Sequence, residues 1–191
     1  MNTVKVPVIL ASQSPRRIEL LKTIINDFQV IPSKIDEICK ADLSPEENAK
    51  LLSRKKAVSV AKHKPHHLVI GADTIVVLKE KIIGKPIDTE NARQILRQLS
   101  GQEHKVITGV SIVHSEIFSA ASISRVRIKN LTSNEINSYV KSGEPMDKAG
   151  AYAIQGNGSF MVESYDGSYS NIVGLPIDLL KGLLKNQLDF I

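Results

Sequence analysis

The sequence predicts an α/β protein with a mixed β-sheet flanked by helices, and three observations support this class. Strand-like and helical segments follow one another in mixed order along the chain. Two β-branched runs, HKVITGVSIV (104–113) and IFSAASISRVRIKN (117–130), alternate well enough for antiparallel strands. The chain has 191 residues, of which 42% are hydrophobic, enough for one globular domain with a real core in one or two lobes.

Apolar runs and helix-start signals predict the elements of the first hundred residues. Ser44 and Glu47 in SPEE fit a capping box, which begins a helix at Pro45 that runs to about His63. A nearly continuous apolar run over 68–78 predicts a buried strand. The other elements expected here are a buried strand over 4–11, a helix from Pro15 to about Asn26, a short strand over 28–31, a connecting loop over 32–43, a hairpin turn into Ile82 and Ile83, and a helix over about 90–99.

Capping and turn signals also divide the second half of the chain. Thr132 and Glu135 fit another capping box, before a short helix over about 134–141. Two charged, Gly-rich segments, 142–160 and 165–176, are expected to be loops that are too particular to be linkers. Pro176 then begins a closing helix that runs to about Asn186.

The start of the first helix has an unusual charge. Ser14 is expected to supply the N-cap oxygen, and Pro15 suits the first helical position. Arg16 and Arg17 follow in the first turn, where the helix dipole is already positive, at a cost on the order of 0.3–1 kcal/mol per charge. The helices that begin at SPEE, DTEN and TSNE carry acids there instead. Either a bound anion offsets this cost at the free N–H groups, or both arginines extend into solvent.

Bulk charge and cysteine content narrow the function classes. The net charge of +5 and the isoelectric point near 9.3 indicate a surface that attracts anions: nucleic acid, acidic lipid or phosphorylated small molecules. Because the basic residues are spread along the chain, small anions are favoured. The single cysteine, Cys39, excludes an intrachain disulfide, and no apolar run approaches the length of a membrane span. We therefore expect a cytoplasmic protein with no membrane partner.

Two charged residues occupy apolar positions and are candidates for chemistry. Asp73 lies in LVIGADTIVVL (68–78), where a carboxylate needs cations, a metal ion or a raised pKa. It is either a turn residue after Gly71 or a functional carboxylate at a strand end, where open α/β sheets bind ligands. Lys56 lies within the apolar face of its helix, so its side chain either extends past the core to solvent or reaches a cleft and a phosphate.

Other loop residues have chemistry that fits a nucleotide, although each is ordinary by itself. Lys85 in GKP and Lys148 in DKAG could each contact a phosphate as a point charge. The Gln155 amide could bind both donor and acceptor edges of a base. The P-loop, the nucleophile-elbow and dinucleotide fingerprints and paired-cysteine metal motifs do not occur in the sequence. The cluster of His63, His66 and His67 is expected to be a solvated patch, and Cys39 to be inert.

Eight short motifs, taken together, resemble the Maf family of nucleoside triphosphate pyrophosphatases. In order they are LASQSPRRIELL, KIDE, KKA, GADTIVV, GKPID, LSGQEHKVITGV, YVKSGEPMDKAGAYAIQG and GSYSNIVGLP, and they span nearly the whole chain. The resemblance implies a single domain over 1–191 with the fold of this family and of inosine triphosphatases, a mixed twisted sheet in two lobes around a central cleft. It also implies a metal-dependent enzyme that cleaves a nucleoside triphosphate between the α- and β-phosphates.

The resemblance assigns roles to individual residues of this chain. Asp73 matches the general base and, with Glu37, a metal-binding carboxylate, the metal being Mg²⁺ or Mn²⁺. Three positions, Arg17, Thr74 and Gln155, match those associated with substrate choice. Polar and cationic positions of the cleft match Ser12, Arg16, Lys56 and Lys85.

DKAGAYAIQG resembles the branch of the family that acts on dTTP and UTP, and the family also suggests a homodimer. The resulting hypothesis is an enzyme that hydrolyses dTTP and UTP, with modified pyrimidine nucleotides left open as further substrates. No stable nucleic-acid partner is expected. The alternative is a regulatory protein that binds nucleic acid or a cell-division partner, because the family is linked to septum formation. Against this alternative, the aromatic residues needed for base stacking are few, and no basic stripe stands out.

Overall fold

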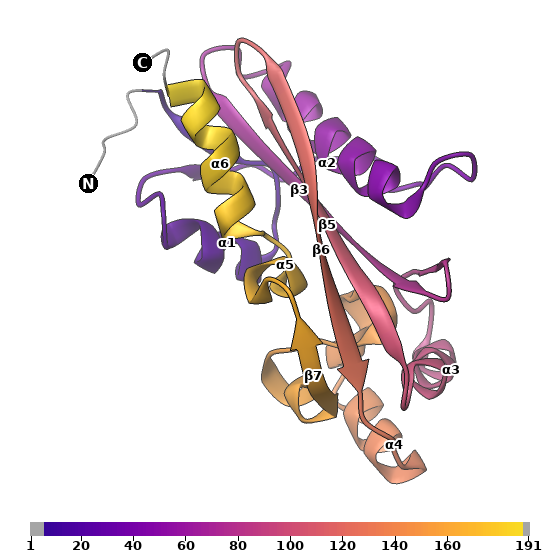
Figure 1. The fold of residues 1–191 in the computed structure, drawn as a ribbon. Helices are drawn as coiled ribbons and strands as arrows, with labels where there is room; N and C mark the ends of the chain where they lie inside the picture. The colour runs from indigo at the N-terminus through magenta and orange to yellow at the C-terminus, as the bar shows by residue number, and fades with distance from the viewer. Residues whose placement is uncertain (1–5, 189–191) are drawn as a thin grey trace. The chain divides into compact units, whose positions relative to one another are not determined.

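Seven strands form one mixed sheet in the computed structural model, which describes residues 6–188 (Figure 1). The strands are β1 (Val8–Leu10), β2 (Gln29–Val30), β3 (Leu68–Leu78), β4 (Lys81–Ile83), β5 (Glu103–Val113), β6 (Ile117–Ile128) and β7 (Val162–Asp166). The α-helices are α1 (Pro15–Lys22), α2 (Pro45–Ala61), α3 (Thr89–Leu99), α4 (Ser133–Lys141), α5 (Tyr169–Val173) and α6 (Ile177–Leu188). Three short 3₁₀ helices, η1 (Glu144–Asp147), η2 (Ala149–Ala151) and η3 (Gly156–Met161), complete the described chain.

The strand order confirms the predicted mixed α/β class. The order is β2-β1-β3-β5-β6-β7, with β4 paired to β3. β1 runs parallel to β2 and β3, whereas β4 pairs antiparallel with β3 and β7 with β6. β5 and β6 are neighbours joined by residues 114–116 alone, a connection that only antiparallel strands can use. The part of the chain that the structure describes holds no helix long and apolar enough to cross a membrane.

The chain divides into two compact units, in agreement with the expected two lobes. Unit 1 comprises the described residues up to Asp73, Thr108–Ser122, and those from Gly174 onward. Unit 2 comprises Thr74–Ile107 and Ile123–Val173. The strands β3, β5 and β6 each contribute residues to both units. The central cleft stays a prediction.

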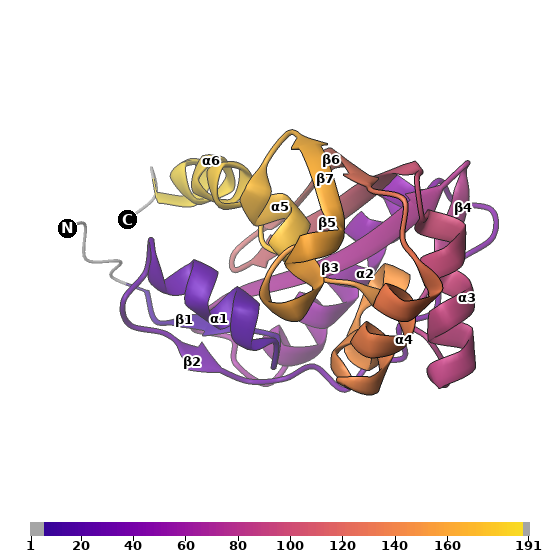
Figure 2. The same cartoon turned by 90° about the horizontal axis from the view of Figure 1, so that it is seen from below.

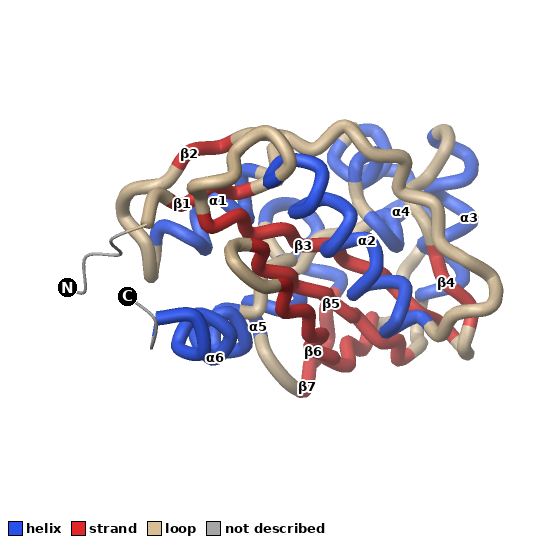
Figure 3. Tube along the Cα trace, turned by 90° about the horizontal axis from the view of Figure 1, so that it is seen from above, coloured by secondary structure: helices blue, strands red, loops and turns tan. Residues whose placement is uncertain are grey.

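In unit 1, alternate residues of the strands face different helices. The residues that face α1 and α6 pack with Leu21 of α1 and with Leu180 and Leu184 of α6; they are Val8, Leu10, Leu68, Ile70, Val110 and Ile112. The residues that face α2 pack with Ala57 and Val60; they are Ile9, Ala11, Val69 and Val113. Figures 1 and 2 show α1 and α6 on one side of these strands, and Figure 3 shows α2 along β3 and β5. The unit 1 parts of β1, β3 and β5 are therefore buried on both faces.

Two glycines allow α2 to lie very close to the sheet. A Cβ at Gly71 on β3 would collide with the Ser53 carbonyl and lie 2.8 Å from the backbone nitrogen of Ala57. At Gly109 on β5, a Cβ would collide with the Ala49 backbone. In the same layer, the Ser53 hydroxyl lies 2.8 Å from that of Ser111. The glycines are therefore needed for the close approach of backbones.

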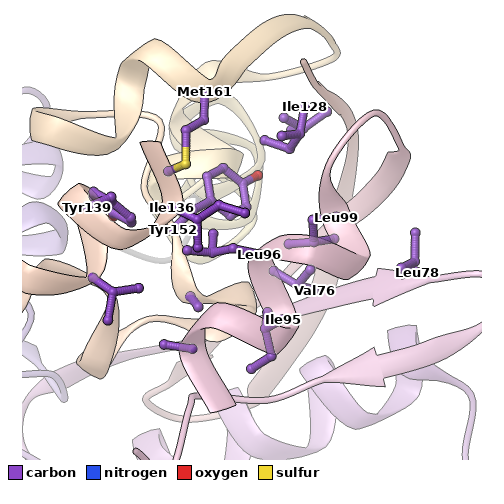
Figure 4. Packing of buried hydrophobic residues seen from close by; sticks show 14 of the residues in the cluster. Val76, Leu78, Ile95, Leu96, Leu99, Ile128, Ile136, Tyr139, Tyr152 and Met161 are labelled. Atoms are coloured by element: carbon purple, nitrogen blue, oxygen red, sulfur yellow. The ribbon is translucent and has the colours of Figure 1, made fainter. Parts of the chain in front are cut away.

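Unit 2 has its own aliphatic core, shown in Figure 4. Residues of α3 and α4 pack there against strand residues and against the segment that follows α4; the labelled members are Val76, Leu78, Ile95, Leu96, Leu99, Ile128, Ile136, Tyr139, Tyr152 and Met161. At its margin, the buried His104 ring places Nε2 2.7 Å from the Tyr152 hydroxyl. Its Nδ1 is buried with no hydrogen-bond partner among the described residues. Burial lowers the pKa of His104 to about 4, so the ring is neutral at pH 7.

Several element boundaries differ from the predicted ones. α1 ends at Lys22 rather than Asn26. The strand expected over 4–11 is shorter, because β1 spans Val8–Leu10. Val4 and Lys5 lie outside the described residues. The segment expected to be a loop over 165–176 contains the end of β7 and all of α5. β7 was missed because nearly all its side chains are exposed, so no apolar alternation marks it. Both predicted capping boxes, Ser44 with Glu47 and Thr132 with Glu135, are confirmed.

Replacing Gly71 with alanine should destabilise the protein. The added methyl group meets backbone atoms of α2, which cannot move aside, so the free energy of unfolding should fall by about 1–3 kcal/mol or more. Gly182→Ala is the matched control, because this exposed α6 position has no described heavy atom within 4 Å beyond its own helix backbone and chain neighbours. This variant should be about 0.5–1 kcal/mol more stable than the wild type. Urea unfolding measures both, and equal stability of Gly71→Ala and wild type would contradict the close-packing account.

Protonation of His104 should make the fold less stable in mild acid. The folded pKa of about 4 lies below the ordinary value of 6.5, so between these pH values the unfolded chain binds a proton that the folded chain does not. The stability that depends on the neutral His104 ring should be fully present above pH 6.5. The free energy of unfolding should then decrease as the pH falls toward 4. His104→Gln should remove roughly 2 kcal/mol of the difference in unfolding free energy between pH 7 and 4.5.

The control for this pH dependence is His63→Gln, at an exposed position. It should leave the pH dependence of urea unfolding as in the wild type. An unchanged slope in His104→Gln would show that His104 does not cause the loss of stability.

Candidate active site

A buried lysine joins two carboxylates in unit 1. The Lys56 ammonium, on α2, donates to Asp73 Oδ1 at 2.6 Å and lies 2.8 Å from Glu37 Oε1. The side chains of Lys56 and Asp73 are only 6% and 7% exposed, whereas that of Glu37 is 43% exposed. The expectation that Lys56 extends past the core to solvent is therefore wrong. Its charge is neutralised inside the protein by carboxylates from β3 and from the loop before α2.

Asp73 lies in the middle of β3, which runs unbroken from Leu68 to Leu78. The interpretation of Asp73 as a turn residue is therefore wrong, and so is its placement at a strand end. The glycine that suggested a turn, Gly71, serves instead to admit α2. Because side chains of a strand alternate, Asp73 shares the face of Val69 and Gly71 that α2 covers, and so meets Lys56.

Arg17 lies at the same site and is held from two directions. Its Nε donates to the Gly174 carbonyl at 2.8 Å, and its Nη1 donates to the Ser12 hydroxyl at 3.4 Å. Burial lowers the pKa of Arg17, the charges of Asp73 and Glu37 raise it, and the neighbouring Arg16 cation lowers it. Arg17 is therefore not extended into solvent, and its guanidinium lies within the electrostatic field of both carboxylates.

The start of α1 is organised by Ser12 rather than by Ser14. Ser14 occupies the N-cap position, but its hydroxyl makes no capping hydrogen bond to the described chain, so the expected N-cap oxygen is wrong. Its backbone N–H instead donates to the buried Ser12 hydroxyl at 3.2 Å. The first bond of the helix ladder that reaches back to the N-cap runs from the Ile18 N–H to the Ser14 carbonyl at 3.1 Å. This end of α1 can bind an anion.

Three of the predicted site residues belong to unit 2. Thr74 follows Asp73 on β3 and, by strand alternation, points to the opposite face. Lys85 is exposed in the loop between β4 and α3, and Gln155 is half-buried in extended backbone before η3. The structure places these residues within unit 2, and their roles stay predictions.

Several residues that shape the site carry no sequence signal of function. Gly174 contributes a carbonyl oxygen, which any residue has, and it adopts a φ of 121° that favours glycine.

In unit 2, the Glu144 carboxylate accepts from the Tyr139 hydroxyl and from the N–H groups of Asn157 and Gly158, close in sequence to Gln155. Lys148, expected to be a phosphate contact, donates to the Glu144 carbonyl at 2.5 Å and to Asp147 at 2.6 Å. Its ammonium thus holds the loop.

Cys39 lies close to the charged cluster but is not activated by it. Burial raises the pKa of the Cys39 thiol, and the charges of Asp73 and Glu37 raise it further. This agrees with the expectation of an inert thiol, because the thiolate is the reactive form.

The two carboxylates of this site suit a divalent cation that takes its remaining ligands from water and from a bound ligand. Among the described residues, no group of three or more His, Cys, Asp or Glu side chains could hold a metal ion. Asp73 and Glu37 nevertheless converge on one point, the Lys56 ammonium. Mg²⁺ commonly uses one or two carboxylates and completes its shell with water and substrate phosphates.

Fold and geometry together define an α/β protein with a strongly charged, partly buried site. Comparison with known sequences gives the family: the Maf-like protein model matches residues 7–187, and this chain belongs to that family. The resemblance deduced from the eight motifs is thereby confirmed.

Curated relatives and a solved structure agree with this membership. The chain is 45% identical to the dTTP/UTP pyrophosphatase of Acetivibrio thermocellus, over 95% of each chain. It is 46% identical to proteins of the same name from Caldicellulosiruptor saccharolyticus and Clostridioides difficile, over 93% of each chain. The Staphylococcus aureus Ham1 protein matches with a TM-score of 0.51 and 16% identity, over 95% of this chain and 99% of that chain. This structural likeness shows the fold alone, and it confirms the predicted α/β architecture.

Removing the Lys56 charge should destabilise unit 1. Lys56→Met leaves the buried Asp73 carboxylate without its ammonium partner, and breaking a buried ion pair in this way costs roughly 3–5 kcal/mol of unfolding free energy. Lys50→Met is the control, because Lys50 pairs with Glu46 at 3.5 Å on the solvent side of the same helix and should contribute less than about 1 kcal/mol.

Adding Asp73→Asn to Lys56→Met should restore part of the lost stability, because it removes the uncompensated charge. Denaturant unfolding of the two single variants and the double variant measures this coupling. Strictly additive effects would contradict a stabilising Lys56–Asp73 pair.

Proposed function

We propose that this protein is a nucleoside triphosphate pyrophosphatase that hydrolyses dTTP and UTP to the monophosphate and pyrophosphate. The observation that carries the proposal is the convergence of Asp73 and Glu37 on the Lys56 ammonium, with Arg17 in the electrostatic field of both carboxylates. The names of the curated relatives support the substrate choice. Residues 1–191 act in this proposal as one domain of the family, in the cytoplasm.

Asp73 is the proposed general base. Lys56 binds Oδ1 and thereby orients the carboxylate, which leaves Oδ2 to accept the proton of the water that attacks the α-phosphorus. The leaving group is pyrophosphate. A carboxylate fixed by a buried lysine on one side can be aimed at a substrate on the other without rearrangement, and such preorganisation is a large part of catalysis of phosphoryl transfer.

The cations of unit 1 bind the triphosphate. Arg17 is held in place by Gly174 and Ser12, and Arg16 adds a second charge at the start of α1. The positive end of the α1 helix dipole also favours the negative charge of a phosphate. Lys85 of unit 2 supplies a further positive charge in this proposal. The bound anion offsets the cost of two arginines in the first turn.

Asp73 and Glu37 would hold the divalent cation, Mg²⁺ or Mn²⁺. When bound, such a cation polarises the phosphate and lowers the pKa of a coordinated water. The two carboxylates supply the protein ligands, and Lys56 keeps them facing each other.

Base selection is assigned to Arg17, Thr74 and Gln155. The Gln155 amide has both a donor and an acceptor, which suits the edge of thymine or uracil. The adjoining backbone of Asn157 and Gly158 is anchored by Glu144, so the Gln155 segment is held in a defined shape. The homodimer suggested by the family likeness belongs to the same proposal, and light scattering of the purified protein tests it.

The direct test is a panel of nucleoside triphosphates with Mg²⁺ and, separately, Mn²⁺. We expect monophosphate and pyrophosphate from dTTP and UTP, and little turnover of purine nucleotides. Release of orthophosphate instead, or no turnover of any triphosphate, would overturn the proposed function.

Asp73→Asn should reduce kcat for dTTP by about a thousandfold or more, because the amide cannot accept the proton of the attacking water. Pyrophosphate release measures the rate, and circular dichroism checks that the variant is folded. Asp166→Asn, at an exposed position of β7, should keep wild-type activity. A fully active Asp73→Asn enzyme would remove Asp73 from the role of base.

A further inference from the structure

The loop that carries Glu37 has little packing of its own. Residues 31–44 connect β2 to α2, and none of these described side chains is buried. Ile38, next to Glu37, is 68% exposed. Hydrophobic burial therefore cannot be what holds the Glu37 carboxylate 2.8 Å from Lys56. Some other contact must restrict this segment.

Asn48 supplies that contact from inside α2. This fully buried side chain accepts from the Lys40 N–H at 2.7 Å and donates to the Lys40 carbonyl at 2.9 Å. The Asn48 amide nitrogen also lies 3.1 Å from the Leu43 carbonyl and 3.3 Å from the Ser44 carbonyl. One side chain thus pairs with both backbone groups of Lys40, as a neighbouring strand would, and fastens the end of the loop as well.

The same helix holds the loop at two places. Asn48 fixes Lys40, and Lys56, about two turns further along α2, binds Glu37. Only Ile38 and Cys39 separate Glu37 from Lys40, so the backbone fixed by Asn48 confines Glu37 to a reach of about 10 Å. α2 packs closely against β3 at Gly71, so this helix has a fixed position relative to the buried Asp73. Because Asn48 belongs to α2, it also fixes where the exposed Glu37 lies relative to Asp73.

We propose that Asn48 is a positioning residue for Glu37: it clamps Lys40 and so keeps the second carboxylate facing Asp73. The inference deepens the proposed function, on which it rests, since Glu37 is there a ligand of the divalent cation. Asn48 acts through the loop and touches no substrate.

Kinetics of Asn48→Ala test the proposal. We expect the Mg²⁺ concentration for half-maximal dTTP hydrolysis to rise by about tenfold or more, as for other residues that orient metal ligands. In a Glu37→Gln background, the same substitution should change this concentration less than about twofold, because the group that Asn48 positions is already lost. Effects that multiply in the double variant would overturn the proposal, since they would indicate a general structural role.

A second measurement does not depend on activity. Hydrogen exchange of the Lys40 amide should be faster in Asn48→Ala by about tenfold or more, while the amides of α2 keep their protection. If the wild-type protein hydrolyses no triphosphate, the proposed function fails, and this measurement still decides whether the clamp exists. An unchanged Lys40 amide would overturn the proposal.

Two further variants separate loss of the clamp from a general loss of stability. Asn48→Leu has nearly the size of asparagine but loses both the acceptor for the Lys40 N–H and the donor to the carbonyls, so it replaces Asn48→Ala in both measurements if the alanine variant does not fold. Asn137→Ala is the matched control, because Asn137 is also a helical asparagine and accepts a hydrogen bond from Arg93 within unit 2. It should leave the Mg²⁺ dependence and the Lys40 amide unchanged.

Discussion

The buried ion pair between Lys56 and Asp73 is the constraint on which the rest of unit 1 depends. Two charges in an apolar layer lose their hydration, and only a close, well-aligned contact offsets that loss. Gly71 and Gly109 remove the side chains that would keep α2 away, and the Ser53–Ser111 hydrogen bond fixes the approach. The 2.6 Å contact thus lies in the same layer as this close backbone packing.

Positive and negative side chains are also balanced in this site. Arg17 and Lys56 are positive, Asp73 and Glu37 are negative, and each carboxylate acts on both cations. Two positive and two negative charges sum to zero within this group, and the neighbouring Arg16 adds one positive charge. The Gly174 carbonyl and the Ser12 hydroxyl contribute dipoles that orient Arg17 without changing that sum. A polyphosphate can therefore be bound by groups that are already in place, at small cost in reorganisation.

Sequence patterns predicted what depends on local periodicity and capping. The bounds of β3 and the start of α2 were predicted correctly because a continuous apolar run and a capping box mark them. The placement of Asp73 was wrong, because glycine before aspartate resembles a turn, and only the position of α2 reveals the other use of Gly71. Ser14 has the composition of an N-cap, yet its hydroxyl makes no capping bond to the described chain and its N–H donates to Ser12. The Arg17–Gly174 contact joins segments 157 positions apart, which no short motif encodes. The contacts of Asn48 are local, but an asparagine in the first turns of a helix does not reveal that its side chain turns back to Lys40.

The hydrogen bond from Arg17 to Gly174 has a consequence for biosynthesis. It joins the first helix to a segment that begins 157 positions later, and that segment also supplies α6, whose Leu180 and Leu184 close one face of the sheet. A nascent chain on the ribosome cannot complete this part of the protein until the segment from Gly174 through α6 has emerged, whatever has already folded upstream. In the proposed enzyme, Arg17 is therefore oriented only after synthesis has passed Gly174, and a product that terminates before this residue lacks the oxygen that holds the arginine.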